Sequence, residues 1–240
     1  MSPIKTGNLV FITIFLTLTI FLYAVYSTTE KLIRNEIHNT VLNTAGVLST
    51  LINIDKHNAL NQENFNVKTY NYMSAILLKG LQSNEEIDSI YTVRLNKSNN
   101  VEFVLLPKNY LNSNSNPSEP FVRYVQPNEF VLQALYENRS VVGPYTDNWG
   151  SFISAYVPMQ STDGKISALG VDFPYANYEK KMEPINDVIS FSFIVSFAIS
   201  LLLGGFVTIT QDLIASVDSN RRQSAEKLQK AFGTYVKNKR

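Results

Sequence analysis

The 240-residue chain has no cysteine, only two histidines and one tryptophan, and almost no net charge. The absence of cysteine excludes a disulfide framework, a thiolate zinc site and an iron–sulfur cluster. With 21 Lys+Arg against 20 Asp+Glu, the chain also lacks the basic surplus of a nucleic-acid-binding protein, so no nucleic-acid partner is expected.

Motifs of the common catalytic and metal-binding classes are missing too. The sequence contains no H-E-x-x-H or G-x-x-x-x-G-K motif and no evident Ser-His-Asp combination. His38 and His57 lie on or beyond a stretch that is polar on their side, so both are expected at the surface. We therefore predict no enzyme activity, no catalytic residue, no metal and no cofactor.

Two long uncharged runs dominate the hydropathy pattern. No charged residue occurs from Thr6 to Thr29 or from Val188 to Gln211. At about 1.5 Å per helical residue, each run is long enough to cross a bilayer core of about 30 Å. A cleavable signal peptide is the alternative for the first run, but its apolar core is longer than such peptides have, and Ala24-Val-Tyr26 is a poor cleavage site.

The short ends of the chain predict its orientation, because a long loop contributes little to the charge rule. Residues 211–240 carry 7 Lys+Arg and 3 Asp+Glu, which favours a cytoplasmic tail. We expect a two-pass protein of the inner (plasma) membrane with both termini cytoplasmic. The predicted divisions are a cytoplasmic N-terminus (1–8), a transmembrane helix (9–27), an extracytoplasmic domain (28–187), a second transmembrane helix (188–210) and a cytoplasmic linker helix (211–240).

Between the spans, the periodicity predicts an α+β domain with an antiparallel sheet. Apolar spacing extends the first span outward as a long helix to about Asn53, and a final helix runs into the second span. The other expected elements are a helix ending near Gly80, strands over 87–95 and 101–106, a loop over 109–120, a helix over 128–137 and strands over 151–159 and 165–173. Since both ends of the domain join membrane helices, a change in its shape must move those helices, as in a signal transducer.

Several short segments of the domain carry a family resemblance. They are Gly143-Pro-Tyr-Thr-Asp-Asn-Trp-Gly150, Ser154-Ala-Tyr-Val-Pro158, Asp163-Gly164-Lys165 and Leu169-Gly-Val-Asp172. In this order, between two membrane spans, they resemble the Cache group of PAS-like extracytoplasmic sensor domains. Such domains occur in bacterial histidine kinases, chemoreceptors, diguanylate cyclases and class III adenylate cyclases. The resemblance implies a single Cache-like domain with a long N-terminal helix and a sheet of about five strands.

The resemblance also implies roles for individual residues in holding an amino-acid-like ligand. Arg123 would hold the ligand carboxylate, while Tyr145-Thr-Asp147 and the later Asp172 would hold its ammonium. The family's Trp two residues after the Arg is Val125 here, which departs from the amino-acid-binding pattern.

General chemistry favours the same residue types, since a guanidinium matches a carboxylate and paired carboxylates neutralise an ammonium. Strand alternation places Ser154 and Tyr156 on the same face of the strand over 151–159, and Arg94 on one face of the strand over 87–95. Plainer alternatives stay open: Asp172 as a helix cap, Tyr145-Thr-Asp147 as a turn, Trp149 as core, and both arginines as solvated or paired. The candidate ligand-binding residues are Arg94, Arg123, Tyr145, Asp147, Trp149, Ser154, Tyr156 and Asp172.

The tail after the second span has a weak 3-4 apolar spacing, and Phe232-Gly-Thr-Tyr-Val236 resembles the segment that precedes class III cyclase domains. The first interpretation of the whole chain is a homodimeric transmembrane sensor that binds a small polar ligand outside the membrane and signals to a cytoplasmic partner. The alternatives are a truncated or regulatory fragment of a transmembrane nucleotide cyclase, and a membrane assembly protein that binds another protein.

Overall fold

The computed structural model describes residues 3–63, 65–107 and 120–237 of the chain. The chain divides into two compact units, one formed by Met1–Thr28 with Pro184–Arg240 and the other by Thr29–Glu183. The loop predicted over 109–120 lies outside the described residues except for Pro120. Each unit is described by itself.

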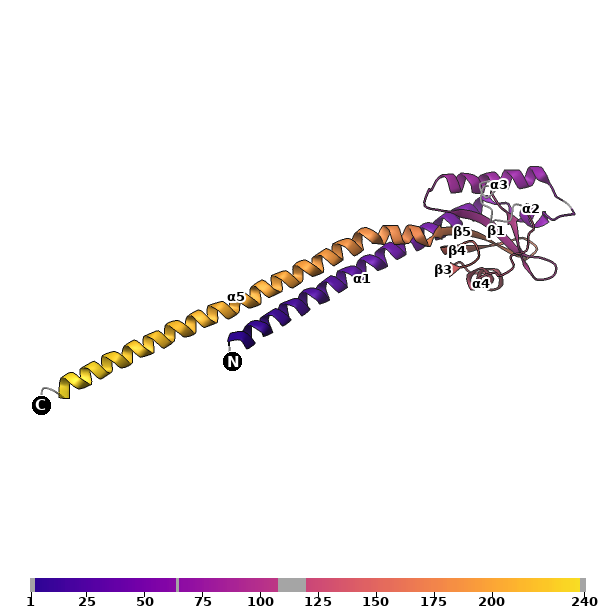
Figure 1. Cartoon of the computed structure of the whole chain (residues 1–240). Helices are drawn as coiled ribbons and strands as arrows, with labels where there is room; N and C mark the ends of the chain where they lie inside the picture. Colours follow the sequence, from indigo (N-terminus) through magenta and orange to yellow (C-terminus); the bar gives the residue numbers. More distant parts are fainter. Residues whose placement is uncertain (1–2, 64, 108–119, 238–240) are drawn as a thin grey trace. The chain divides into compact units, whose positions relative to one another are not determined.

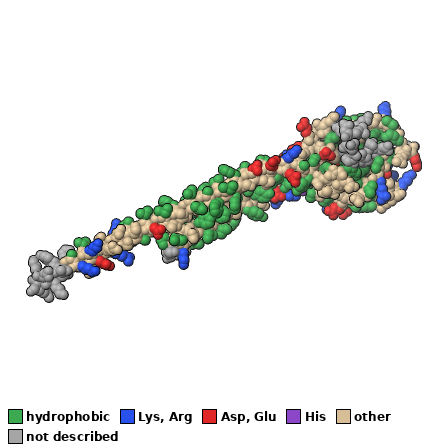
Figure 2. Space-filling view, viewed as in Figure 1, with side chains coloured by type: hydrophobic (Ala, Val, Ile, Leu, Met, Phe, Trp, Pro, Cys, Tyr) green, Lys and Arg blue, Asp and Glu red, His purple; other side chains and the backbone are tan. Residues whose placement is uncertain are grey.

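The first unit consists of parts of two long helices. Helix α1 (Pro3–Leu51) has 49 residues and α5 (Tyr175–Lys237) has 63, and they contain the two uncharged runs (Figure 1). Both helices are long and apolar enough to cross a membrane. Hydrophobic side chains gather along the middle of this helical part, and Lys and Arg are seen towards its C-terminal end (Figure 2).

Small residues let the two helices of this unit approach closely. Ser196, Ser200 and Gly204 follow one another at intervals of four on α5, and all three are buried. A Cβ atom on Gly204 would lie 2.8 Å from the carbonyl oxygen of Gly7 on α1. Because the side chains are small, the two backbones can come this near without a clash.

The second unit is built on a five-stranded antiparallel sheet with the order β2-β1-β5-β4-β3. This sheet and the long N-terminal helix confirm the predicted α+β fold. The strands are β1 (Ser89–Leu95), β2 (Val101–Leu105), β3 (Val141–Thr146), β4 (Ser151–Gln160) and β5 (Ile166–Pro174).

Helices cover both faces of the sheet (Figure 1). Helix α4 (Glu129–Glu137) packs on β3, β4 and β5, and its buried Val131, Ala134 and Leu135 join a core cluster with Tyr91 and Tyr156. The other face holds α1, α2 (Ile54–Ala59) and α3 (Val67–Gln82), whose buried side chains include Val41, His57 and Leu77. The three shorter helices all begin after an asparagine whose side chain accepts a backbone N–H three residues on, as N-caps do.

Two of these elements were not predicted, and both have a physical explanation. Strand β3 contains Gly143 and Pro144, which are rare in strands, but it lies at the edge of the sheet, where proline is tolerated. Helix α2 is only six residues long, so it has too few turns to show a periodic pattern, and the cap at Asn53 starts it.

Candidate functional site

A row of three polar side chains crosses the face of the sheet that α4 covers. Asp172 on β5 pairs with Ser89 on β1 and with Ser154 on β4. Side chains of directly paired residues project from the same face, so these three gather at one point. All three are buried.

Asp172 is a buried carboxylate whose partners are neutral hydroxyls. Its Oδ1 accepts hydrogen bonds from Ser154 Oγ at 2.5 Å and from Tyr91 Oη at 3.3 Å, and its Oδ2 accepts one from Ser89 Oγ at 2.7 Å. Burial, and to a smaller extent the nearby Asp88, raise the pKa of Asp172, while the hydroxyl hydrogen bonds lower it; the net value is about 7. Near neutral pH this carboxyl group can therefore either hold or release a proton.

Two tyrosines connect Asp172 to the start of α4. Tyr91 and Tyr156 flank Gly170, and their hydroxyl oxygens are 2.9 Å apart. A Cβ atom on Gly170 would lie 2.7 Å from the Tyr91 ring, so only glycine leaves room for this pair. Asn128, the N-cap of α4, donates to Tyr156 Oη at 2.8 Å. The start of α4 is thus joined to Asp172 through Tyr156 and Tyr91.

The turn after β3 brings a second carboxylate to the same face. Asp147 Oδ1 accepts the backbone N–H groups of Trp149 at 2.9 Å and Gly150 at 3.2 Å, so the predicted turn role is present. Its Oδ2 accepts a hydrogen bond from Tyr124 Oη at 3.4 Å. Trp149 packs on Tyr124 with ring centroids 5.5 Å apart, which makes the indole part of the wall around Asp147.

Tyr145 completes the group, which we call the tyrosine–aspartate cluster: Ser89, Tyr91, Tyr124, Asn128, Tyr145, Asp147, Ser154, Tyr156 and Asp172. Burial raises the pKa of Tyr145, and the nearby Asp172 raises it further. Burial also raises the pKa values of Tyr91, Tyr124 and Tyr156, so all four phenols keep their protons. The cluster combines two carboxylates with aromatic walls, which suits an ammonium group.

The structure brings together six of the eight predicted residues, namely Tyr145, Asp147, Trp149, Ser154, Tyr156 and Asp172. The two arginines lie elsewhere. Arg94 is on the opposite face of the sheet, where its Nε donates to Glu102 Oε1 at 2.8 Å. Arg123 is exposed and lies opposite Glu102 in an isolated bridge beside β2. Its neighbour Tyr124 is the residue that enters the cluster.

The prediction for His57 was wrong. Its side chain is fully buried, with Nε2 2.7 Å from Thr92 Oγ1 and Nδ1 3.1 Å from Asn58 Oδ1. Desolvation lowers the pKa of His57 to about 4, although the Asn58 hydrogen bond opposes this, so the imidazole is neutral at pH 7. The polar sequence around His57 gave no sign that α2 would direct its side chain towards the sheet.

Four members of the cluster were not predicted from the sequence: Ser89, Tyr91, Tyr124 and Asn128. Strand alternation already places Ser89 and Tyr91 on one face of β1, but only the pairing with β5 and β4 shows that this face carries Asp172. Asn128 had a recognisable signal, since asparagine before an apolar helical run is a typical N-cap. In the described parts of the chain, no three His, Asp or Glu side chains are grouped so that they could hold a metal ion.

Comparison with known proteins gives matches only among solved structures. No protein-family profile matches the chain, and no curated protein matches it. The ligand-binding domain of the Campylobacter jejuni chemoreceptor Tlp3, solved with 4-methylisoleucine, is 20% identical with a TM-score of 0.43, over 71% of this chain and 62% of that one. The same receptor's sensory domain with isoleucine bound is 18% identical with a TM-score of 0.41, over 73% of this chain and 65% of that one.

A third match is the extracellular domain of a putative histidine kinase, soHK1S-Z6, at 12% identity and a TM-score of 0.33, over 66% of each chain. The chain thus spans less than two thirds of the length of the Tlp3 domains. These three matches are domains of a chemoreceptor and of a putative histidine kinase.

Proposed function

We propose that the chain is a membrane sensor whose extracytoplasmic domain binds a small polar ligand through an ammonium group at the tyrosine–aspartate cluster. The observation that carries this proposal is Asp172, a buried carboxylate with only hydroxyl groups as hydrogen-bond partners among the described residues. Keeping such a group ionised without a counter-charge costs free energy, and a bound ammonium would supply that charge. Asp147 would add a second negative charge beside the same tyrosines.

The place of Asp172 in the chain supports a signalling role. Strand β5, which carries Asp172, ends at Pro174, and α5 begins at the next residue and continues through the second uncharged run. The first turns of α5 are tied to α1, because Tyr178 Oη donates to Glu30 Oε1 at 3.3 Å and its ring lies 5.6 Å from the Arg34 guanidinium. A ligand that moves β5 would therefore shift α5 against α1.

The experiment is a binding measurement on the full chain in lipid nanodiscs. Amino acids and simple amines are screened, and each amino acid is compared with the carboxylic acid that lacks its amino group. The amine should bind and its partner acid should not, and Asp172→Asn should weaken amine binding at least tenfold. Asp163→Asn is the matched control, since Asp163 lies in the exposed β4–β5 turn. Equal binding of amine and acid, or full affinity in Asp172→Asn, contradicts the assigned site.

Proton release gives a second readout of the same site. An ammonium pairs with the ionised carboxyl only, so with a pKa of about 7 for Asp172 the affinity should fall about tenfold per pH unit below that value. Titrations at pH 5, 6 and 8 measure this dependence, which should disappear in Asp172→Asn.

Signalling and the expected homodimer are tested together by spin labels. The chain has no cysteine, so Asn8→Cys on α1 and Ser216→Cys on α5 can be labelled selectively. Distances between the labels should change when the amine binds, and a singly labelled chain should show a distance only if two copies associate. Unchanged distances with ligand bound would favour the alternative of an assembly protein.

The side chains of the cyclase-like segment 232–236 lie outside those described.

A further inference from the structure

A polar pocket lies at the other end of β1 from the tyrosine–aspartate cluster. It has a volume of about 830 Å³ and is formed by the α2–α3 connection (58–63), the β1–β2 turn (94–98) and the β4–β5 turn (164–167). Arg94 pairs with Ser167, which is five residues along β5 from Asp172, or roughly 17 Å at 3.4 Å per residue. Since Arg94 and Asp172 also face opposite sides of the sheet, this pocket is distinct from the tyrosine–aspartate cluster.

Arg94 is held rigidly in the pocket wall. Its side chain is only 12% exposed, its Nε donates to Glu102 Oε1 at 2.8 Å and its Nη1 donates to the backbone oxygen of Asn58 at 3.1 Å. The guanidinium also lies over the Phe121 ring, 5.6 Å from the centroid. Its hydrogen bonds within the described parts of the chain come from Nε and Nη1, which leaves the third nitrogen, Nη2, without one. A guanidinium fixed in this way offers its remaining donors at little entropic cost.

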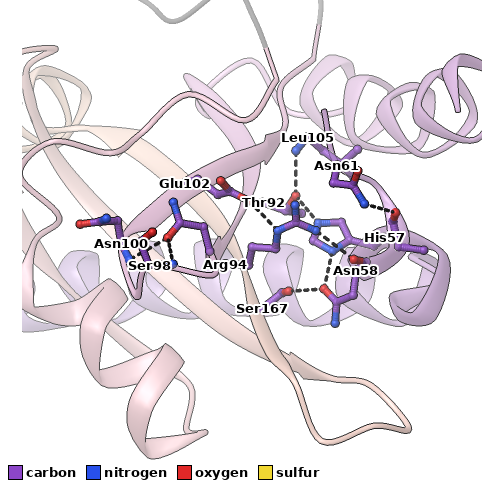
Figure 3. A network of polar contacts seen from close by, with 12 residues as sticks. His57, Asn58, Asn61, Thr92, Arg94, Ser98, Asn100, Glu102, Leu105 and Ser167 are labelled. Atoms are coloured by element: carbon purple, nitrogen blue, oxygen red, sulfur yellow. Dashed lines mark hydrogen bonds and ion pairs between the residues drawn. The ribbon is translucent and has the colours of Figure 1, made fainter. Parts of the chain in front are cut away.

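The side chain of Asn58 is fixed by its neighbours and leaves a second donor without a partner (Figure 3). Its Oδ1 accepts from Ser167 Oγ at 2.6 Å and faces His57 Nδ1 at 3.1 Å. His57 is itself held by Thr92, which accepts the backbone N–H of Leu105. Asn58 Nδ2 is buried and makes no hydrogen bond within residues 3–63, 65–107 and 120–237.

Hydrogen-bond donors without partners, and not net charge, favour an anion in this pocket. Glu102 is paired with Arg94 and Lys165 with Asp163, and the other charged side chains of the described wall, Glu63 and Lys97, are exposed and of opposite sign. Among the described residues, the polar atoms of these two side chains that lack hydrogen-bond partners are Arg94 Nη2 and the buried Asn58 Nδ2, and both are donors. We propose that this pocket is a second binding site, for a small carboxylate-bearing ligand held by Arg94 and Asn58. A planar guanidinium and an adjacent amide match the two oxygens of a carboxylate.

The test is calorimetric titration of the full chain in neutral-lipid nanodiscs at pH 7.5 with acetate and succinate, and with succinamide as the uncharged probe. The double variant Arg94→Gln/Glu102→Gln removes both charges but keeps polar side chains that can pair. The matched control is Arg139→Gln/Glu137→Gln, which makes the same change in an exposed ion pair. Thermal unfolding followed by the fluorescence of the single tryptophan, Trp149, checks that each variant is folded.

Succinate or acetate should bind the wild type and the control, and about 10- to 100-fold more weakly the Arg94/Glu102 variant, as expected for lost charge-assisted hydrogen bonds. Succinamide should not bind. Asp172→Asn should leave carboxylate affinity unchanged, so failure of this site and failure of the amine site are distinguishable. If the double variant does not fold, Arg94→Lys keeps the ion pair and should still lose affinity about tenfold. No carboxylate binding to the wild type, or equal binding to Arg94→Lys, would overturn the proposal.

Discussion

Replacing Asp172 by asparagine should stabilise the domain most at alkaline pH, and the gain should shrink as the pH falls towards 3.8. The pKa of Asp172 rises from its ordinary value of 3.8 to about 7, chiefly through burial. The folded state therefore holds a proton that the unfolded state has already lost between these two values. The contribution of the neutral group to stability is complete below pH 3.8 and is lost as pH rises through about 7.

The magnitude follows from the two pKa values. Each pH unit between the two pKa values lowers the free energy of unfolding by about 1.4 kcal/mol. Relative to a domain with a neutral group at position 172, the wild type is therefore destabilised by about 4 kcal/mol at pH 8 and by about 2 kcal/mol at pH 5. Asparagine has nearly the shape of the neutral acid and carries no charge at either pH. For a domain of this size, the unfolding midpoint of Asp172→Asn at pH 8 should exceed that of the wild type by roughly 10 °C.

The assay is thermal unfolding of the full chain in nanodiscs at pH 5, 6, 7 and 8, followed by Trp149 fluorescence. Asp163→Asn is again the matched control: hydrogen bonds from Lys165 and Ser161 lower the pKa of this exposed carboxyl to about 2, so its removal should bring no gain at pH 8. An Asp172→Asn variant that is no more stable than the wild type at pH 8, or whose advantage is the same at every pH, would refute a raised pKa at Asp172.

Three further substitutions test other parts of the structure. His57→Gln should make the domain more resistant to acid, because the pKa of His57 is about 4 in the folded state against an ordinary 6.5. As the pH falls from 6.5 to 4, the free energy of unfolding of the wild type should drop by about 3 kcal/mol relative to that of the variant, measured by the same unfolding assay. Gly170→Ala should weaken amine binding at least tenfold and lower the unfolding midpoint, because its Cβ would press on the Tyr91 ring; unchanged amine affinity in calorimetry would contradict this. Gly204→Val should loosen the packing of α1 and α5 and lower the midpoint by several degrees, whereas Gly205→Val, which points into open space, should not; equal midpoints would refute the close approach.

Much of the fold was predictable because it depends on local periodicity. The strands β1, β2, β4 and β5 and the helices α3 and α4 all lie within a few residues of their predicted bounds, since apolar-rich runs between turn residues mark the strands and helical spacing marks the helices. Strand β3 was not predicted because its composition is unusual for a strand, and its position at the edge of the sheet is what allows it to be one.

The candidate site was only partly predictable, because its members come from strands that are neighbours in space and not in sequence. The family resemblance implied a polar ligand site with Asp172, and strand alternation added Tyr156, but neither could show that Ser89 and Tyr91 lie beside them. It also could not separate Arg94 from the other candidates, since one strand's alternation leaves open which face meets which helix.

By itself, then, the sequence determined two apolar helices, an α+β domain between them and the residue types of a polar site, all of which depend on short-range spacing and hydropathy. Only the tertiary structure decided which carboxylate is buried, that His57 is in the core, and that the cluster at Asp172 and the pocket at Arg94 occupy opposite faces. The physical reason is the register of the sheet: burial, pKa and partner choice follow from which strands pair and which helix covers each face, and these are long-range contacts.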